Sequence, residues 1–353
     1  MSHNKTLVIL TPGFPKDETD STCLPMQQQL VETLQKTDPN LNIIVLSFQY
    51  PYHNWEYRWR GIRVIPFNGR NKGGIARLTL RQKILAVLGR IHEEHTIFSL
   101  LSFWYGECAA IGHLFAKKNR LCHYCWILGQ DAKKENKYPK RTGLKANALI
   151  ALSDSISATF ELNHGLKPLH IITPGINTSL FGATPIEKNI DLLAVGSLIR
   201  LKRFEIFIEI VASIKENIPG IKAELIGNGP EKENLSALIK KLDLQDTLNI
   251  MGELPYPGVL SRMQKARILL HPSVYEGFSG VCMEALYAGA HVLSFCRPMN
   301  TGIQQWHIVS SVEEMTQRAI NILNAPTHDS NNILYCSIEE AATKMRALIL
   351  QER

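Results

Sequence analysis

Short apolar runs alternate with amphipathic segments along the whole chain. Parallel strands joined by crossover helices produce such alternation, so the pattern predicts an α/β protein. The apolar runs that we predict as strands in the first half are 7–10, 42–48, 98–103, 124–128 and 148–152. Apolar residues at helical spacing predict helices at 24–36 and 74–91.

The alternation is interrupted at Pro174-Gly175, and the residues up to Asn189 contain turn formers with little periodicity. A second series then follows, with strands expected at 192–195, 223–226, 248–251, 268–270 and 291–295 and a terminal helix at 338–350. We therefore expect two Rossmann-like domains facing across a cleft, at residues 1–175 and 176–336. Residues 337–353 are a candidate to return to the first domain.

The net charge of +7 is concentrated in two segments, at 70–90 and 133–145. Solvated surface charge is one interpretation, and binding of an anionic partner is the other. The candidate partners are a nucleotide diphosphate, a phosphorylated acceptor and an anionic membrane, which a basic amphipathic helix at 74–91 would contact. The alternative for this helix is that its apolar face packs on the sheet of the first domain. A nucleic acid is not expected, because no aromatic platform interleaves the basic residues.

The seven cysteines are an odd, scattered set, which favours a reducing, cytoplasmic compartment. The pair Cys122 and Cys125 falls inside a predicted strand, so we expect ordinary thiols and no metal there. The apolar run at 7–10 is too short for a signal peptide or a membrane span. Any membrane contact is therefore expected at the surface, on the inner face.

Glu276 and Glu284 are separated by a glycine-containing turn, which follows an apolar run and precedes a helical pattern. The turn falls where a helix N-terminus exposes backbone N–H groups, which suits a phosphate. Glu284 would lie about 7 Å along the helix axis from that end. A diphosphate at the helix tip could then extend a ribose to Glu284 and a sugar to Glu276. This arrangement predicts a nucleotide-sugar site.

Other candidate contacts with that ligand follow neighbouring predicted strands. Lys202 and Arg200 would stabilise the negative charge that grows on a departing diphosphate. The remaining candidates are glycine turns, small side chains and loop residues that could approach the nucleotide: Gly196, Ser197, Gly227, Gly229, Met251, Leu254, Gly277, Phe278 and Ser279. In the first half, Trp104, Glu107 and Asp131 follow strand ends and are candidates for acceptor binding.

The second half resembles the retaining glycosyltransferases of the GT-B fold, family 4, also known as glycosyl transferases group 1. The resemblance is carried by Val195-Gly-Ser-Leu with Lys202-Arg203, by Gly227-Asn-Gly-Pro230, and by Pro272-Ser-Val-Tyr-Glu-Gly-Phe278 with Glu284-Ala285 and Gly289. It is strong over residues 190–296 and weak in the first half.

The resemblance implies transfer of a hexose from a UDP- or GDP-sugar to a glycan or lipid-linked acceptor in envelope polysaccharide synthesis, with retention of configuration. It implies that Glu284 binds the donor ribose, Glu276 the donor sugar and Lys202 the diphosphate. It also implies no cofactor, no metal and no dedicated catalytic base.

Three departures from the family pattern motivate an alternative, a degenerate protein that binds nucleotide sugar or a partner without turnover. Ser197 replaces an arginine, which leaves Arg200 or Arg203 as the substitute. Ser21-Thr22 replaces a glycine pair, and Leu128 replaces a histidine.

Overall fold

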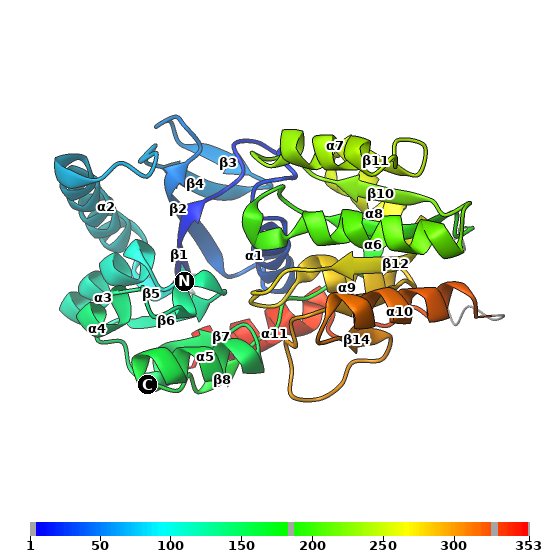
Figure 1. Ribbon diagram of the computed structural model, residues 1–353. Helices are drawn as coiled ribbons and strands as arrows, with labels where there is room; N and C mark the ends of the chain where they lie inside the picture. Colours follow the sequence, from blue (N-terminus) through cyan, green and yellow to red (C-terminus); the bar gives the residue numbers. More distant parts are fainter. Residues whose placement is uncertain (1–4, 183–186, 326–330, 352–353) are drawn as a thin grey trace. The chain divides into compact units, whose positions relative to one another are not determined.

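The computed structural model describes residues 5–182, 187–325 and 331–351. The chain forms two compact units, Met1–Gly175 with Ile338–Arg353, and Ile176–Ser337. Both are α/β units with parallel sheets, which confirms the predicted fold class (Figure 1). No helix among the described residues combines the length and the apolarity needed to cross a membrane.

The first unit contains an eight-stranded sheet in the order β3-β4-β2-β1-β5-β6-β7-β8. Its strands are parallel except for the antiparallel pair β3 and β4. The strands are β1 (Thr6–Gly13), β2 (Asn42–Tyr50), β3 (Tyr57–Trp59), β4 (Ile62–Pro66), β5 (Ile97–Phe103), β6 (Cys122–Ile127), β7 (Leu149–Ala151) and β8 (His170–Ile171). Residues of β1 are buried on both faces, as a parallel sheet covered by helices requires.

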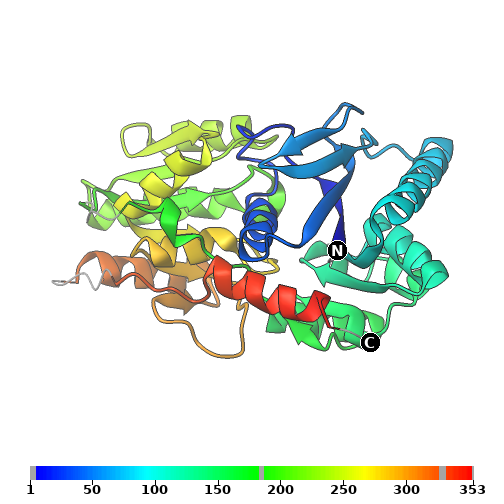
Figure 2. The same cartoon turned by 180° about the vertical axis from the view of Figure 1, so that it is seen from behind.

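The helices of the first unit are α1 (Pro25–Thr37), α2 (Gly74–His95), α3 (Glu107–Asn119), α4 (Tyr138–Thr142), α5 (Asp154–His164) and α11 (Ile338–Ile349). Helix α11 packs beside α1, and Arg346 Nη2 lies 2.9 Å from the Asp38 carboxylate just after α1 (Figure 2). The terminal helix therefore completes the first unit although it lies at the other end of the sequence.

The apolar stripe of α2 packs mainly on the sheet. Ile84, Leu88 and Ile91 are buried in one cluster with residues of β1, β2 and α3. Ile75 and Leu78, by contrast, are 83% and 58% exposed. Of the two interpretations of this stripe, packing on the sheet thus holds for most of the helix, because its apolar residues are covered by the core.

The second unit contains a parallel six-stranded sheet in the order β11-β10-β9-β12-β13-β14. Its strands are β9 (Ile190–Val195), β10 (Ala223–Ile226), β11 (Leu248–Gly252), β12 (Ala266–His271), β13 (His291–Ser294) and β14 (Trp306–Ile308). Its helices are α6 (Phe204–Asn217), α7 (Lys232–Lys241), α8 (Tyr256–Lys265), α9 (Gly280–Tyr287) and α10 (Val312–Leu323). Strands β10, β9 and β12 are neighbours, so the loops that follow them meet at one edge of the sheet.

Close packing between α3 and the sheet depends on Gly112. A Cβ atom there would lie 2.7 Å from both His123 Nε2 and Leu10 Cδ1. We predict that Gly112→Ala lowers the free energy of unfolding by about 1–3 kcal/mol, because overpacking outweighs the better helix propensity of alanine. Chemical denaturation measures this change.

Gly89 in α2 is the matched control, because a Cβ there meets nothing within 4 Å. Gly89→Ala should raise the free energy of unfolding by about 0.5–1 kcal/mol. Equal effects of the two substitutions would show that the α3 contact does not restrict residue size.

Candidate functional site

Two glycine turns of the second unit are stacked on each other after β9 and β10. Gly227 has a φ of +149°, and a Cβ atom there would lie 1.9 Å from the carbonyl oxygen of Gly196. The N–H of Gly196 in turn donates to the carbonyl of Ile226 at 3.0 Å. Gly229 is confined in the same way by the backbone of Leu198. These glycines therefore serve loop-to-loop packing, which fixes the position of the chain leading to Lys202.

Lys202, Glu276 and His271 form a cluster in that unit. The ammonium of Lys202 bonds to the Glu276 carboxylate, and His271 Nε2 lies 3.2 Å from Glu276 Oε1. Lys202 is brought there by the short helical turn Arg200–Lys202, and Glu276 by the loop after β12. The structure thus joins two predicted site residues that are 74 positions apart in the sequence.

The cluster keeps Glu276 ionised. Burial alone would raise the pKa of Glu276, but the neighbouring His271 and the charge of Lys202 outweigh burial and lower the pKa to about 2. Glu276 is therefore an anion at neutral pH and an acceptor of hydrogen bonds, and it cannot serve as a general acid there.

His271 is absent from the sequence-based list of site residues. It is the last residue of β12 and its side chain is only 3% exposed. The sequence did contain a signal for it. His271 is a polar residue at the end of an apolar strand and lies five positions before Glu276. The strand pattern alone does not show which acid it faces.

Helix α9 begins at the predicted phosphate turn. Ser279 is its N-cap, and the Ser279 hydroxyl accepts the N–H of Cys282 at 3.3 Å. Gly277, Phe278 and Ser279 of this turn are buried. The Phe278 ring packs edge to face on Trp306 at 5.7 Å, so Phe278 anchors the turn, and any ligand contact is left to its backbone.

Glu284 lies in the second turn of α9 and is 6% exposed. Its carboxylate accepts a hydrogen bond from the hydroxyl of Tyr256, the first residue of α8, at 2.7 Å. Burial raises the pKa of Glu284 to about 7, against the opposing effect of the Tyr256 hydrogen bond. The two predicted acids therefore have opposite electrostatic environments.

The other predicted residues of this unit differ in their partners and their exposure. The Arg200 side chain is 91% exposed, with Nε 3.3 Å from Glu231. Arg203 Nε lies 3.8 Å from Glu205. Ser197 is exposed, while Met251 at the end of β11 and Leu254 after it are half-buried.

In the first unit, Asp131 has an internal role. Its carboxylate accepts the backbone N–H groups of Tyr105 and Gly129 at 2.7 Å each and that of Leu128 at 3.1 Å. It joins the loop after β5 to the loop after β6. We therefore correct the expectation that Asp131 binds an acceptor hydroxyl, because its oxygen atoms are already occupied.

Trp104 and Glu107 both follow the end of β5. Trp104 is half-buried and has a φ of +65°, an uncommon conformation for a bulky residue. Glu107 is held by two arginines of α2, with Arg81 Nε at 2.6 Å and Arg77 Nε at 3.4 Å.

Residues 177–305 match the sequence profile of one protein family, described as glycosyl transferases group 1. Over this segment the chain is similar to that family. The segment contains the Lys202–Glu276–His271 cluster and Glu284, so the residues that carried the resemblance lie inside the matched region.

Curated relatives match the chain over part of their length. The phosphatidylinositol N-acetylglucosaminyltransferase gpi3 subunit of Schizosaccharomyces pombe is 27% identical over 164 residues, 45% of this chain and 36% of that protein. The Campylobacter jejuni N-acetylgalactosamine-N,N'-diacetylbacillosaminyl-diphospho-undecaprenol 4-alpha-N-acetylgalactosaminyltransferase is 28% identical over 174 residues, 48% of this chain and 44% of that enzyme. The chain thus spans less than half the length of either relative.

Solved structures resemble the chain over nearly its whole length. The lipopolysaccharide outer core galactosyltransferase WaaB has a TM-score of 0.71 at 16% identity and covers 98% of this chain and 99% of its own. Sucrose-phosphate synthase from Thermosynechococcus elongatus has a TM-score of 0.68 at 16% identity, and the match covers 98% of this chain and 95% of the synthase. The chain therefore has the GT-B fold of these structures, as predicted.

The environment of Glu284 gives a prediction on stability. Its pKa in the folded state, about 7, exceeds the reference value of 4.5, so the fold favours the neutral acid. That stabilisation is complete below pH 4.5 and is lost as the pH rises through 7. Glutamine cannot ionise. We therefore expect the free energy of unfolding of Glu284→Gln, relative to the unmodified protein, to rise by about 2 kcal/mol between pH 5 and pH 8.

Glu276→Gln provides the control for this measurement by denaturation at the two pH values. With a folded pKa of about 2, Glu276 is ionised throughout that interval, so its substitution should show little pH dependence there. A flat response of Glu284→Gln would mean that Glu284 ionises normally in the fold.

Proposed function

We propose that the protein is a retaining glycosyltransferase of family 4 that transfers a hexose, or an N-acetylated hexosamine, from a UDP- or GDP-sugar. The acceptor class that we propose is a glycan or a lipid-linked glycan in cell-envelope polysaccharide synthesis. The observation that carries this proposal is the Lys202–Glu276–His271 cluster beside the loops of the family segment.

The mechanism is mainly electrostatic. A departing nucleoside diphosphate gains negative charge in the transition state, and a cation fixed beforehand stabilises that charge without reorganisation. Lys202 supplies the cation, and the N-terminus of α9 supplies backbone N–H groups. Since Lys202 is already oriented by Glu276, the ammonium is positioned before the donor binds.

Each glutamate then has a distinct role in the proposal. The ionised Glu276 accepts hydrogen bonds from hydroxyls of the donor sugar. Glu284 binds the ribose, and its bond to Tyr256 gives way to ribose hydroxyls when the donor enters. The fixed positive charge supports chemistry without a metal or another cofactor. The leaving phosphate assists the incoming acceptor hydroxyl, so no side chain is assigned as a base.

The comparisons support the donor class indirectly. The Anabaena protein Alr3699/HepE, whose TM-score to this chain is 0.68, has been solved in complex with UDP and glucose. The name of the first curated relative describes transfer of N-acetylglucosamine to phosphatidylinositol, and that of the second describes transfer of N-acetylgalactosamine to a diphospho-undecaprenol-linked acceptor. Those acceptors differ from each other, so the acceptor is proposed here only as a class.

We predict that Lys202→Ala lowers kcat/KM for the donor by about 100-fold or more, because a charge that acts in the transition state is lost. Glu284→Ala should raise the donor KM about tenfold or more, because ribose hydrogen bonds are lost. The measurement is release of UDP or GDP from a panel of sugar nucleotides in the presence of EDTA.

The exposed residues Lys241 and Glu209 provide matched alanine controls, which should retain full activity. Unchanged activity in both site variants would reject the assigned site. Donor binding by calorimetry without turnover on any acceptor would favour the alternative, a protein that binds nucleotide sugar without catalysis.

We further propose a cytoplasmic protein whose first unit touches the anionic inner membrane surface through the first turns of α2. Exposed Ile75 and Leu78 flank Arg77 there, a combination that suits an interface. Replacing both apolar residues by serine should lower cosedimentation with phosphatidylglycerol vesicles at least about threefold. The control replaces Leu162 and Leu169, which are 85% and 64% exposed elsewhere in this unit. Equal loss in both variants would reject the specific contact.

A further inference from the structure

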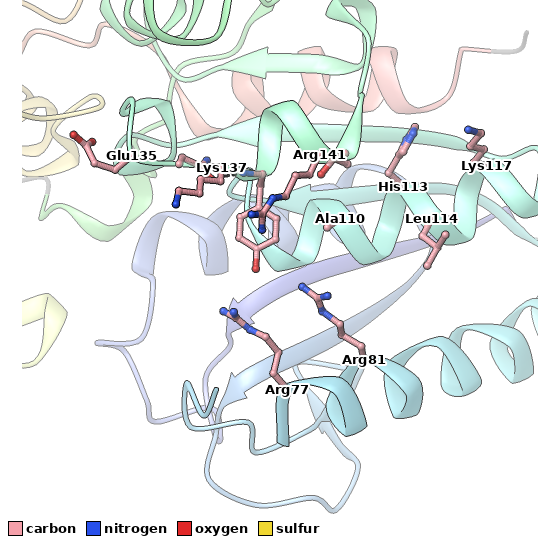
Figure 3. A pocket seen from close by; sticks show the side chains of 12 residues that line it. Arg77, Arg81, Ala110, His113, Leu114, Lys117, Glu135, Lys137 and Arg141 are labelled. Carbon is pink, nitrogen blue, oxygen red and sulfur yellow. Dashed lines mark hydrogen bonds between the residues drawn. The ribbon is translucent and has the colours of Figure 1, made fainter. Parts of the chain in front are cut away.

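The first unit contains a cavity of about 730 Å³ with a strongly basic lining. Its walls come from α2, α3, α4 and the segment that precedes α4. Figure 3 shows Arg77 and Arg81 extending from α2 toward the segment of Lys137 and Arg141, with His113 and Lys117 along α3. The lining residues are Arg77, Arg81, Ala110, His113, Leu114, Lys117, Glu135, Asn136, Lys137, Tyr138, Arg141 and Thr142.

Helical periodicity explains why these side chains share one cavity. Arg77 and Arg81 are four residues apart and so lie on one face of α2. Ala110, Leu114 and Lys117 recur at intervals of four and three residues along one face of α3. The cavity is therefore built by regular secondary structure, which holds the charged groups on rigid supports.

The charges in the lining are unbalanced. Five cations, Arg77, Arg81, Lys117, Lys137 and Arg141, accompany one carboxylate, the exposed Glu135. Glu107 contributes a second carboxylate, which orients both arginines of α2. Among the described residues, no carboxylate lies within ion-pair distance of Lys117, Lys137 or Arg141. These three cations remain available to a ligand.

The surrounding groups show the effect of this positive field. Burial and, secondarily, the charge of Lys117 lower the pKa of His113, so this histidine stays neutral at neutral pH. Like charges brought together from several elements repel one another, and only Arg77 and Arg81 are paired with a carboxylate among the described residues. An anion that enters the cavity relieves the repulsion.

Guanidinium groups and lysines that approach from several directions suit a phosphate ligand better than they suit a ligand with a single carboxylate. Arginine offers planar pairs of donors to phosphate oxygens, and lysine adds compact charges. The cavity volume exceeds that of one phosphate, and Ala110 and Leu114 give the lining an apolar portion. The ligand thus combines an anionic group with a further, less polar part.

We propose that this cavity binds a phosphate or pyrophosphate group, namely that of the acceptor. Its assignment to the acceptor rests on the transferase function proposed above, whereas the phosphate binding does not. The group could be carried by a lipid-linked or by a water-soluble molecule, and the two carriers share the same contacts with Arg77, Lys117 and Arg141.

The test is calorimetric titration with inorganic pyrophosphate at low salt. All proteins carry Lys202→Ala, so that the donor-site lysine makes no contribution. The double variant Lys117→Glu/Arg141→Glu should bind at least about tenfold more weakly than its parent, because two charge-assisted contacts become repulsive.

The matched control is Lys118→Glu/Lys140→Glu. This control makes the same change in net charge. Lys118 is next to Lys117 in α3 and Lys140 is next to Arg141 in α4, but neither control residue lines the cavity. Its affinity should change less than about threefold, since only screened surface charge is altered. If charge reversal unfolds the double variant, Arg141→Ala compared with Lys140→Ala makes the same distinction.

Equal affinities in the cavity and control variants would overturn the proposal, as would the absence of pyrophosphate binding to the parent protein. A selective loss supports it, even if no sugar nucleotide is turned over and the transferase proposal fails. A C15 isoprenyl diphosphate identifies the carrier. Binding about tenfold tighter than pyrophosphate indicates a lipid-linked group, and equal binding indicates a soluble one.

Discussion

The ion pair between Lys202 and Glu276 is the interaction on which the candidate site depends. It joins the loops after β9 and β12, which are neighbouring strands, and His271 lies against the same carboxylate. Its members are substantially buried, so separating them would leave a charge with little solvent to replace its partner. The pair therefore holds the ammonium in place and keeps the acid ionised, and both effects suit the proposed binding of an anionic donor.

The position of the loop after β9 depends in turn on its backbone packing against the loop after β10, which leaves no room for a side chain. The Gly227 Cα faces the carbonyl of Gly196, and the Gly229 Cα faces the backbone of Leu198. Because the two turns touch directly, the segment that carries Lys202 has a defined course. The glycines that resemble a ligand-binding motif thus act on the ligand through the lysine that they position.

Much of the fold was predictable, because parallel strands buried on both faces produce apolar runs that are easy to recognise. Strands β3, β4, β8 and β14 were missed. Of these, β3, β8 and β14 offer only two or three residues and little pattern, whereas β4 has five residues. Within the site, the spacing predicted Glu276, Glu284 and Lys202 as neighbours of one ligand. It could not reveal His271 or Tyr256, which face those acids only after folding. Asp131 was misassigned because a strand-end carboxylate can bind a ligand or cap a loop, and only its hydrogen bonds distinguish the two roles.

The two glutamates show why residue type alone does not determine chemistry. Glu276 is partly buried beside cations and has a pKa of about 2, whereas Glu284 is buried beside a hydroxyl and has a pKa of about 7. A fold optimised only for stability would not bury an acid such as Glu284 without a neighbouring cation. Its retention costs stability above pH 7, and a ligand that brings hydroxyl donors offsets that cost on binding. The cations that line the cavity between α2 and α3 resemble Glu284 in this respect. Their mutual repulsion is unfavourable, and a bound anion would remove it. Both features are unfavourable in the free protein, and the ligands proposed for the two sites would make them favourable.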